Sequence, residues 1–277
     1  MANPILSRPD AFTQRAPQGY AQPGYGYPQQ PMGYPQQGFG APQQGYGAPQ
    51  QAPQYTAEPT MTLDDVIAKT GVTMLVLAAV AAATFVLLPP QLLGPSLVVS
   101  ALVGFVTVLL VAARKKINPG LVMVYAAIEG VFIGAFSKMF EYNYPGIVSQ
   151  AVMATFVTAG CTLAAYKFFN IRVTPKFRRM IFIGTAAFAG VMLVNFILAL
   201  LGVNLGLRAG AVGLIAALLG IALAVSNLVV DFDDVERGIR MGAPASESWR
   251  AAFGITVTMV WLYTEILRLL SYFRSNN

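Results

Sequence analysis

Seven long apolar runs constrain this chain more than any other feature of its sequence. They cover residues 71–88, 96–113, 121–140, 147–168, 181–201, 211–230 and 251–272. Each is close to the roughly 20 residues that an α-helix needs to cross the hydrocarbon core of a bilayer. Only 11% of all residues are charged, against roughly 25% in soluble domains, so the chain lacks the polar coat that seven buried helices of a soluble protein would need. The sequence therefore predicts an all-α membrane protein, a seven-transmembrane-helix bundle.

The first 60 residues differ in composition from the rest. They repeat the words GYPQQ, GFGAPQQ and GYGAPQQ at residues 33–37, 38–44 and 45–51. Segments this rich in Pro, Gln and Gly bury too little apolar area to offset the entropy of ordering the backbone. We therefore expect a disordered cytoplasmic tail over residues 1–60 and a transmembrane domain over residues 61–277. The spaced tyrosines favour weak self-association, whereas the plainer interpretation is a solvated tether.

Residues that the chain lacks exclude several classes of function. It has no histidine and a single cysteine, Cys161, which excludes histidine-based catalysis, cysteine-cluster metal sites and an internal disulfide. It also lacks a glycine-rich phosphate loop, a serine nucleophile elbow and a metalloprotease helix signature. We therefore expect neither an enzyme nor a cofactor. With apolar runs this long, the net charge of +6 indicates a membrane orientation signal rather than a nucleic-acid surface.

Lysine and arginine at the ends of the runs predict the orientation of the chain, because cytoplasmic connections carry an excess of both. One set of connections holds twelve of them and the other holds four. The twelve are Lys69, Arg114, Lys115, Lys116, Lys167, Arg172, Lys176, Arg178, Arg179, Arg237, Arg240 and Arg250, and the four are Lys138, Arg208, Arg268 and Arg274. We therefore expect the N-terminus in the cytoplasm and the C-terminus outside, in the plasma (inner) membrane of a bacterial cell.

Three carboxylic acids fall within or beside the apolar runs. Glu129 lies in the middle of the third run, Asp231 closes the sixth and Glu265 lies within the seventh. An ionisable group at membrane depth costs roughly 3 kcal/mol and usually faces a bundle interior or a water-filled path. These three residues are therefore candidates for an ion pathway. For Glu129, which has no basic residue within a helical turn, the structural alternative is a protonated acid bonded to a neighbouring backbone.

The other two acids also have structural interpretations. Asp231 can be an interfacial residue of an acidic loop that includes Asp233 and Asp234. Glu265 can be neutralised by Arg268, which follows it at the i, i+3 spacing of helix neighbours. Both interpretations would leave the two acids without a role in transport.

Four segments resemble the actinobacterial branch of the Bax inhibitor-1-like membrane family. They are MTLDDVIAKTG (61–71), NPGLVMVYAAIEGVFIGAFS (118–137), DFDDVERGIRMGAP (231–244) and WRAAFGITVTMVWLYTEILRLLSYFR (249–274). They follow the family's order over about residues 60–274, with the tail outside. The resemblance implies a seven-helix bundle with its seventh helix near the centre. It also implies a pH-sensitive calcium leak, gated by an acid on the sixth helix and an acid on the seventh that share a proton.

Matched to the family's motifs, Asp231 resembles the sixth-helix acid and Glu265 the seventh-helix acid. The better-known members read Leu-Tyr-Leu-Asp where this chain reads Leu-Tyr-Thr-Glu. Glu129 resembles an acid that those members carry on an early helix. The resemblance thus implies a pH-sensing pathway at these three acids, with Arg268, Asp233 and Asp234 as nearby modulators. Calcium would pass transiently at Asp231 and Glu265, and no tightly bound metal is expected.

Elementary chemistry supports a paired sensor, because two carboxylates in contact cannot both ionise cheaply and titrate as a unit. At 1.5 Å per residue, Asp231 and Glu265 reach the same depth only if one of two conditions holds. The sixth helix must continue past Asp231, or the seventh must begin before Arg250. We expect both in part.

Two functions follow from the sequence. The first is a pH-sensitive calcium (cation) leak in the bacterial membrane, with calcium ions and the lipid bilayer as partners. The second is a non-conducting regulator that docks on membrane protease or stress-response machinery, with the tail as the arm that binds this membrane protein partner. A proton-coupled transporter would show inverted repeats and broken helices, and the sequence has neither.

The charge distribution makes a direct prediction about topology. A reporter fused after Asn277 should be active only outside the cytoplasm, because seven spans carry the C-terminus to the side opposite the basic connections. Paired fusions of a periplasmic and a cytoplasmic reporter measure this directly. A cytoplasmic C-terminus would mean that one of the seven runs does not cross the bilayer.

Overall fold

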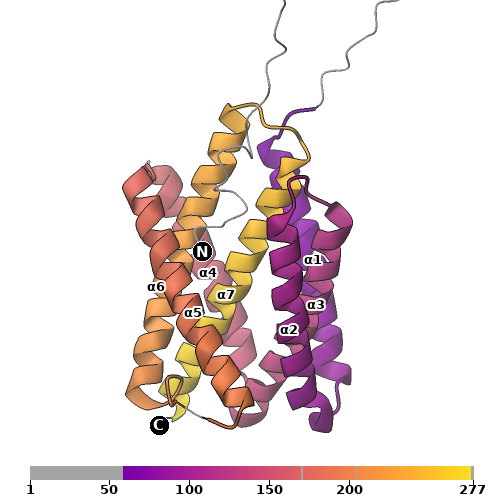
Figure 1. Ribbon diagram of the computed structural model, residues 1–277, viewed down its shortest axis with the longest axis vertical. Coiled ribbons are helices and arrows are strands. Elements are labelled where there is room, and N and C mark those ends of the chain that lie inside the picture. Colours follow the sequence, from indigo (N-terminus) through magenta and orange to yellow (C-terminus); the bar gives the residue numbers. More distant parts are fainter. Residues whose placement is uncertain (1–58, 170, 204, 276–277) are drawn as a thin grey trace, which may run out of the picture. The chain divides into compact units, whose positions relative to one another are not determined.

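The computed structural model describes residues 59–169, 171–203 and 205–275. Within them lie seven helices that are long and apolar enough to cross a membrane, so the chain is an all-α, multi-pass membrane protein, as the sequence predicts (Figure 1). The tail predicted over residues 1–60 lies almost wholly outside the described residues.

The helices follow one another with short connections. They are α1 (Leu63–Leu87), α2 (Leu93–Ala113), α3 (Pro119–Asn143), α4 (Ile147–Phe168), α5 (Pro175–Leu200), α6 (Gly210–Arg240) and α7 (Glu247–Ser275), and the short 3-10 helix η1 (Pro90–Leu92) precedes α2. The described residues contain no β-strand, and the isolated bridge between Thr60 and Pro244 is the one β-type pairing among them.

Local signals set where several helices begin. The Thr62 side chain accepts a hydrogen bond from the Asp65 amide at 3.2 Å, which caps the start of α1 with two residues three apart in the sequence. Asn118 and Thr174 cap α3 and α5 in the same way, each followed by a proline at the first helical position. A side-chain oxygen at the cap satisfies an amide that has no partner within the helix.

The sixth helix is longer than the run that predicted it. The apolar run ends at residue 230, whereas α6 continues to Arg240. The additional turns contain the buried acids Asp233 and Asp234. Because these residues are charged, hydropathy alone assigns this segment to a loop. Asp231 therefore lies inside a helix, and its interpretation as part of a loop is wrong.

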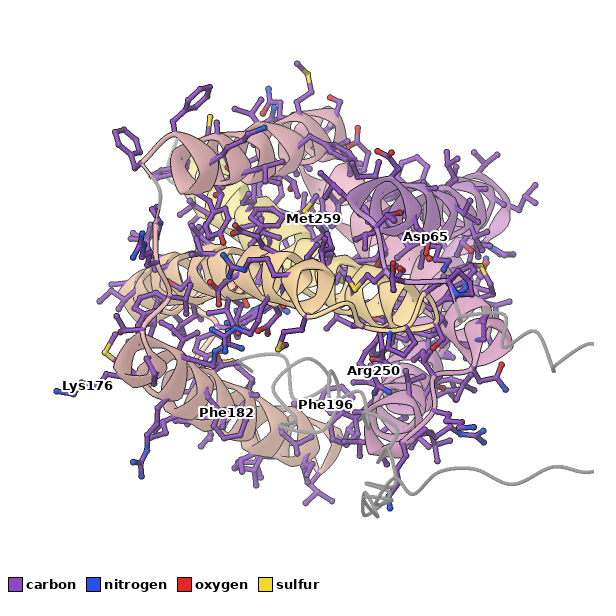
Figure 2. All side chains as sticks on the ribbon, turned by 90° about the horizontal axis from the view of Figure 1, so that it is seen from above. Asp65, Lys176, Phe182, Phe196, Arg250 and Met259 are labelled. Atoms are coloured by element: carbon purple, nitrogen blue, oxygen red, sulfur yellow. The ribbon has the colours of Figure 1, made fainter. Side chains whose placement is uncertain are left out.

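Helix α7 lies at the centre of the bundle. It packs against α1, α3, α4 and α6 and is more fully buried than any other helix. Figures 1 and 2 show it in yellow with the other helices around it. Such a position agrees with the arrangement that the family resemblance implies, and it places every acid of α7 in the interior.

Helices α1 and α3 approach closely because two glycines of α3 face α1. A Cβ atom on Gly130 would lie 2.7 Å from the carbonyl oxygen of Leu77, and one on Gly134 would collide with the carbonyl oxygen of Ala81. Small residues four apart let helix backbones approach closely in a membrane. No side chain other than that of glycine fits at either position.

This contact predicts the effect of one methyl group. Gly134→Ala should lower the free energy of unfolding by about 1–3 kcal/mol, the usual cost of overpacking. Gly160→Ala on α4 is the matched control, since nothing lies within 4 Å of its added Cβ, and it should be neutral or slightly stabilising. Thermal unfolding in detergent measures both, and equal effects of the two substitutions would contradict the close packing of α1 on α3.

Candidate functional site

The contact between α6 and α7 has two chemically different halves. One buried stripe of α6, which meets α7 and also α5, recurs every three or four residues, as expected for one helix face. Its members are Gly213, Ala217, Gly220, Ala224, Asn227, Asp231, Asp234 and Gly238. The first four are small and apolar, and the next three are polar. We call this contact the α6–α7 seam, with an Arg208 end before its small residues and an Arg178 end beyond its polar ones.

An ion pair fills the half of the seam near the Arg208 end. The Arg208 Nη1 and Nη2 atoms donate to the two carboxylate oxygens of Glu265 at 2.8 and 3.0 Å. Glu265 is buried, and its side chain occupies the space that Gly220 leaves on α6, where a Cβ would lie 2.8 Å from the Glu265 Cδ atom. A bidentate, charge-assisted pair of this kind is both strong and geometrically specific.

The connection between α5 and α6 places the Arg208 side chain inside the bundle. Two glycines with positive φ, Gly206 and Gly210, flank the arginine and let the backbone turn back sharply. The Arg208 Nε atom also donates to the Met192 sulfur at 3.0 Å, and the Tyr272 hydroxyl donates to the Arg208 carbonyl at 2.7 Å. The arginine is therefore held from α5 and α7 together.

The other half of the seam holds Asp231. The Thr258 hydroxyl of α7 donates to its Oδ2 atom at 2.6 Å, and both residues are buried. One turn earlier, the Asn227 amide donates to the Thr185 hydroxyl of α5 at 2.8 Å. The Asn227 Oδ1 atom is buried and accepts no hydrogen bond.

Arg178 of α5 closes the acidic end of the seam. It pairs with Asp233 at 2.7 Å and with Asp234, and Arg237 also pairs with Asp233, at 3.0 Å. The second carboxylate oxygen of Asp234, Oδ2, is buried without a hydrogen-bond donor. The predicted modulators Asp233 and Asp234 thus belong to a buried ion-pair cluster.

The structure does not bring Asp231 and Glu265 together. On α7, Thr258, which contacts Asp231, is seven residues from Glu265, about 10 Å along the axis. On α6, Gly220, which contacts Glu265, is eleven residues from Asp231, about 16 Å. Both helices are extended as expected, but the two acids still lie at different depths. Each has its own partner from another segment.

Arg268 does not form the ion pair that the sequence suggests, and Glu129 lies away from the seam. Glu265 pairs with Arg208 rather than Arg268, whose guanidinium lies 5.3 Å from the centre of the Phe136 ring. Glu129 lies at the contact of α3 with α2, since a Cβ on Gly104 would be 3.1 Å from its Oε2 atom. In the described part of the chain α3 does not contact α6, so Glu129 is separate from the seam.

The basic partners of the buried acids are not among the candidate site residues that the sequence predicts. In the sequence, Arg208 is only a basic residue between two apolar runs, and Arg178 is one member of a basic cluster. The glycines on either side of Arg208 are the one local signal of a tight turn. Nothing in the sequence around Thr258 or Thr185 distinguishes these two residues from the threonines whose hydroxyls donate to a backbone carbonyl of their own helix.

The described residues contain no group of three or more acidic or cysteine side chains arranged to hold a metal ion. The polar half of the seam offers its oxygen atoms one after another along α6. Asn227, Asp231 and Asp234 occupy positions i, i+4 and i+7 of α6, so their side chains lie on one face of that helix. Such an arrangement suits a cation that moves rather than one that is retained.

Comparison with known families agrees with this architecture. A family model described as Bax inhibitor 1 like matches residues 3–275. The chain belongs to the Bax inhibitor 1-like family. The match extends almost to the first residue, so the expectation that the N-terminal segment lies outside the family's pattern is wrong. No curated protein matches this family member.

The buried ion pair predicts a non-additive effect on stability. Arg208→Met and Glu265→Leu should each lower the free energy of unfolding by about 3–5 kcal/mol, because each leaves one buried charge without its partner. The double variant should recover most of the loss, since an apolar pair carries no such penalty. Thermal unfolding in lipid nanodiscs measures the cycle, and additive losses would show that the two side chains do not act as a pair.

Proposed function

We propose that this family member is a pH-sensitive calcium leak of a bacterial plasma membrane, and that the ion follows the α6–α7 seam. The observation that carries the proposal is the pair of buried acceptors, Asn227 Oδ1 and Asp234 Oδ2, that receive no hydrogen bond. Buried polar atoms normally have partners, and each exception needs an explanation. A hydrated cation moving along this face would supply both atoms with a partner.

The charge of the polar half supports a cation rather than an anion. Asp231 and Asp234 are i, i+3 neighbours on α6, which places their side chains adjacent on one face. Intramembrane acids that face a bundle interior mark ion and proton pathways. Arg178 pairs with both Asp233 and Asp234. Arg237 also pairs with Asp233.

The same neighbours offer a proton switch that differs from the one expected across the two helices. Two adjacent carboxylates cannot both ionise cheaply, so they take up and release protons as a coupled pair. Asp231 and Asp234 lie one turn apart on one face of α6, whereas Asp231 and Glu265 lie at different depths. The pH sensor of the proposal is therefore the Asp231–Asp234 pair.

The ion pair of Arg208 and Glu265 closes the pathway at its other half. A guanidinium in a narrow passage repels cations, and selective pores use arginine in this way. Removing both charges, with Arg208→Gln and Glu265→Gln together, should therefore raise the leak several-fold, and it leaves neither member of this pair without its partner. The conformation described here is thus a closed one in this proposal.

Calcium flux into proteoliposomes of the purified full chain tests the proposal. The flux should differ between about pH 6 and pH 8, a range that brackets coupled carboxylates. Asp231→Asn should abolish this difference, because it removes one member of the pair and keeps its shape. Glu236→Gln is the matched control, since Glu236 lies on the same helix in an exposed pair with Arg240.

Two results would contradict the proposal. One is the absence of calcium flux at any pH in folded protein, which would favour the non-conducting regulator that binds a membrane partner. The other is an equal change in Asp231→Asn and Glu236→Gln, which would place the sensor away from the seam.

A further inference from the structure

A groove of about 580 Å³ opens between α1 and α4, on a different side of α7 from the seam. The two flanking helices do not contact each other in the described part of the chain, and α3 and α7 form the floor. Met259 of α7, labelled in Figure 2, is one of the floor residues. The volume falls in the range of small-molecule sites, roughly 300–1,000 Å³.

The lining of the groove is apolar. On α1 it includes Met74, Ala78, Ala82 and Phe85, and on α4 it includes Val148. Its few hydroxyl groups are engaged within the protein. The Ser137 and Tyr263 hydroxyls bond each other at 2.6 Å, and the Thr155 hydroxyl donates to the Ala151 carbonyl at 2.7 Å. A ligand here gains by burying apolar surface, not by hydrogen bonding.

The shape of the groove favours a chain over a compact molecule. Along α1 it extends from Met74 to Phe85, eleven residues or about 16 Å of helix. It opens sideways between two helices that cross the membrane, so its mouth faces the hydrocarbon region of the bilayer. The molecules with long apolar chains at that depth are the membrane lipids themselves.

Two basic side chains lie where the groove reaches the Arg208 end of the bundle. Lys138, next to the lining residue Ser137, donates to the Leu88 carbonyl at 2.6 Å, just beyond α1. Arg274 donates to the Pro145 carbonyl at 2.6 Å and to the Gln150 side chain at 3.1 Å, at the start of α4. An ammonium has three donors and a guanidinium five, so both retain donors for another acceptor.

The acid at this end is already engaged. The Glu141 carboxylate accepts from the Gly146 and Val148 amides at 2.5 and 3.1 Å, which caps the start of α4. Negative charge at a helix N-terminus is stabilised by the helix dipole. The excess charge beside the groove is therefore positive, which complements a phosphate.

We propose that the groove binds one acyl chain of an anionic phospholipid, whose phosphate lies between Lys138 and Arg274. Apolar lining, length along the membrane normal and positive charge at one end all match such a lipid. The site is independent of the calcium pathway, because it lies between other helices and uses none of the acids of the seam.

Photo-crosslinking of the full chain tests this site. The protein is reconstituted in phosphatidylcholine vesicles with a trace of phosphatidylglycerol that carries a diazirine in its acyl chain. The label should concentrate on the groove residues of α1 and α4. It should exceed the label from the matching phosphatidylcholine probe by at least about fivefold, the gain from one basic residue beside an anionic headgroup.

Two variants separate the chain site from the headgroup site. Ala82→Phe fills the groove and should lower the label about tenfold, the loss expected when two methylene groups are no longer buried. Ala83→Phe, at the neighbouring exposed position of α1 that does not line the groove, should leave the label unchanged. Lys138→Gln with Arg274→Gln should reduce the phosphatidylglycerol label to the level of the phosphatidylcholine probe.

Three outcomes would overturn the proposal. The label could spread evenly over the lipid-facing surfaces of all helices, the two probes could label the protein equally, or the Ala82 and Ala83 variants could behave alike. Because the comparison of the two probes uses the unmodified protein, the test does not depend on the folding of any variant.

Discussion

Hydrocarbon offers no hydrogen bonds, so a polar side chain at membrane depth must find its partner within the protein. In this bundle three of the polar contacts made by α6 and α7 use partners from α5 or from the connection before α6. Thr185 and Arg178 of α5 bind Asn227 and the acidic turn of α6, and Arg208 binds Glu265 of α7. Since α5 lies beside α6 and contacts α7 through the ring pair of Phe188 and Trp261, these polar contacts help to fix where α5 lies.

That arrangement requires small residues on α6. A bidentate ion pair needs room, and Gly220 provides it on one side of Glu265, as Gly213 does for the Tyr272 hydroxyl. In the other half of the seam the stripe changes from small to polar residues, and acidic side chains occupy the positions that small residues hold in the first half. One helix face thus carries a tightly packed half and an acidic half, and this asymmetry underlies the assignment of a closed half and a cation-attracting half.

Sequence patterns predicted what depends on a single helix and missed what depends on two. Apolar length identified seven membrane-crossing helices, and the Thr62 cap follows from residues three apart on one chain segment. The partners of Glu265 and Asp231 depend on the rotation and depth of neighbouring helices, which no spacing within one helix specifies. Arg268 illustrates the limit, because its i, i+3 spacing to Glu265 is correct for a helix pair, yet Arg208, fifty-seven positions away, provides the ion pair.

The placement of α7 explains how one central helix can serve two surfaces. Thr258 and Glu265 are seven residues apart and therefore lie on one face, which meets α6, whereas Met259 and Tyr263 face the apolar groove. The polar contacts with α6 and the apolar lining of the groove thus lie on different faces of the same helix. Substitutions in the groove remove apolar contacts without touching a charge, and substitutions in the seam change charges without opening the groove. An effect of Ala82→Phe on calcium flux would therefore require a movement of α7, which both surfaces share, or of α1 or α4, which line the groove and also contact α6.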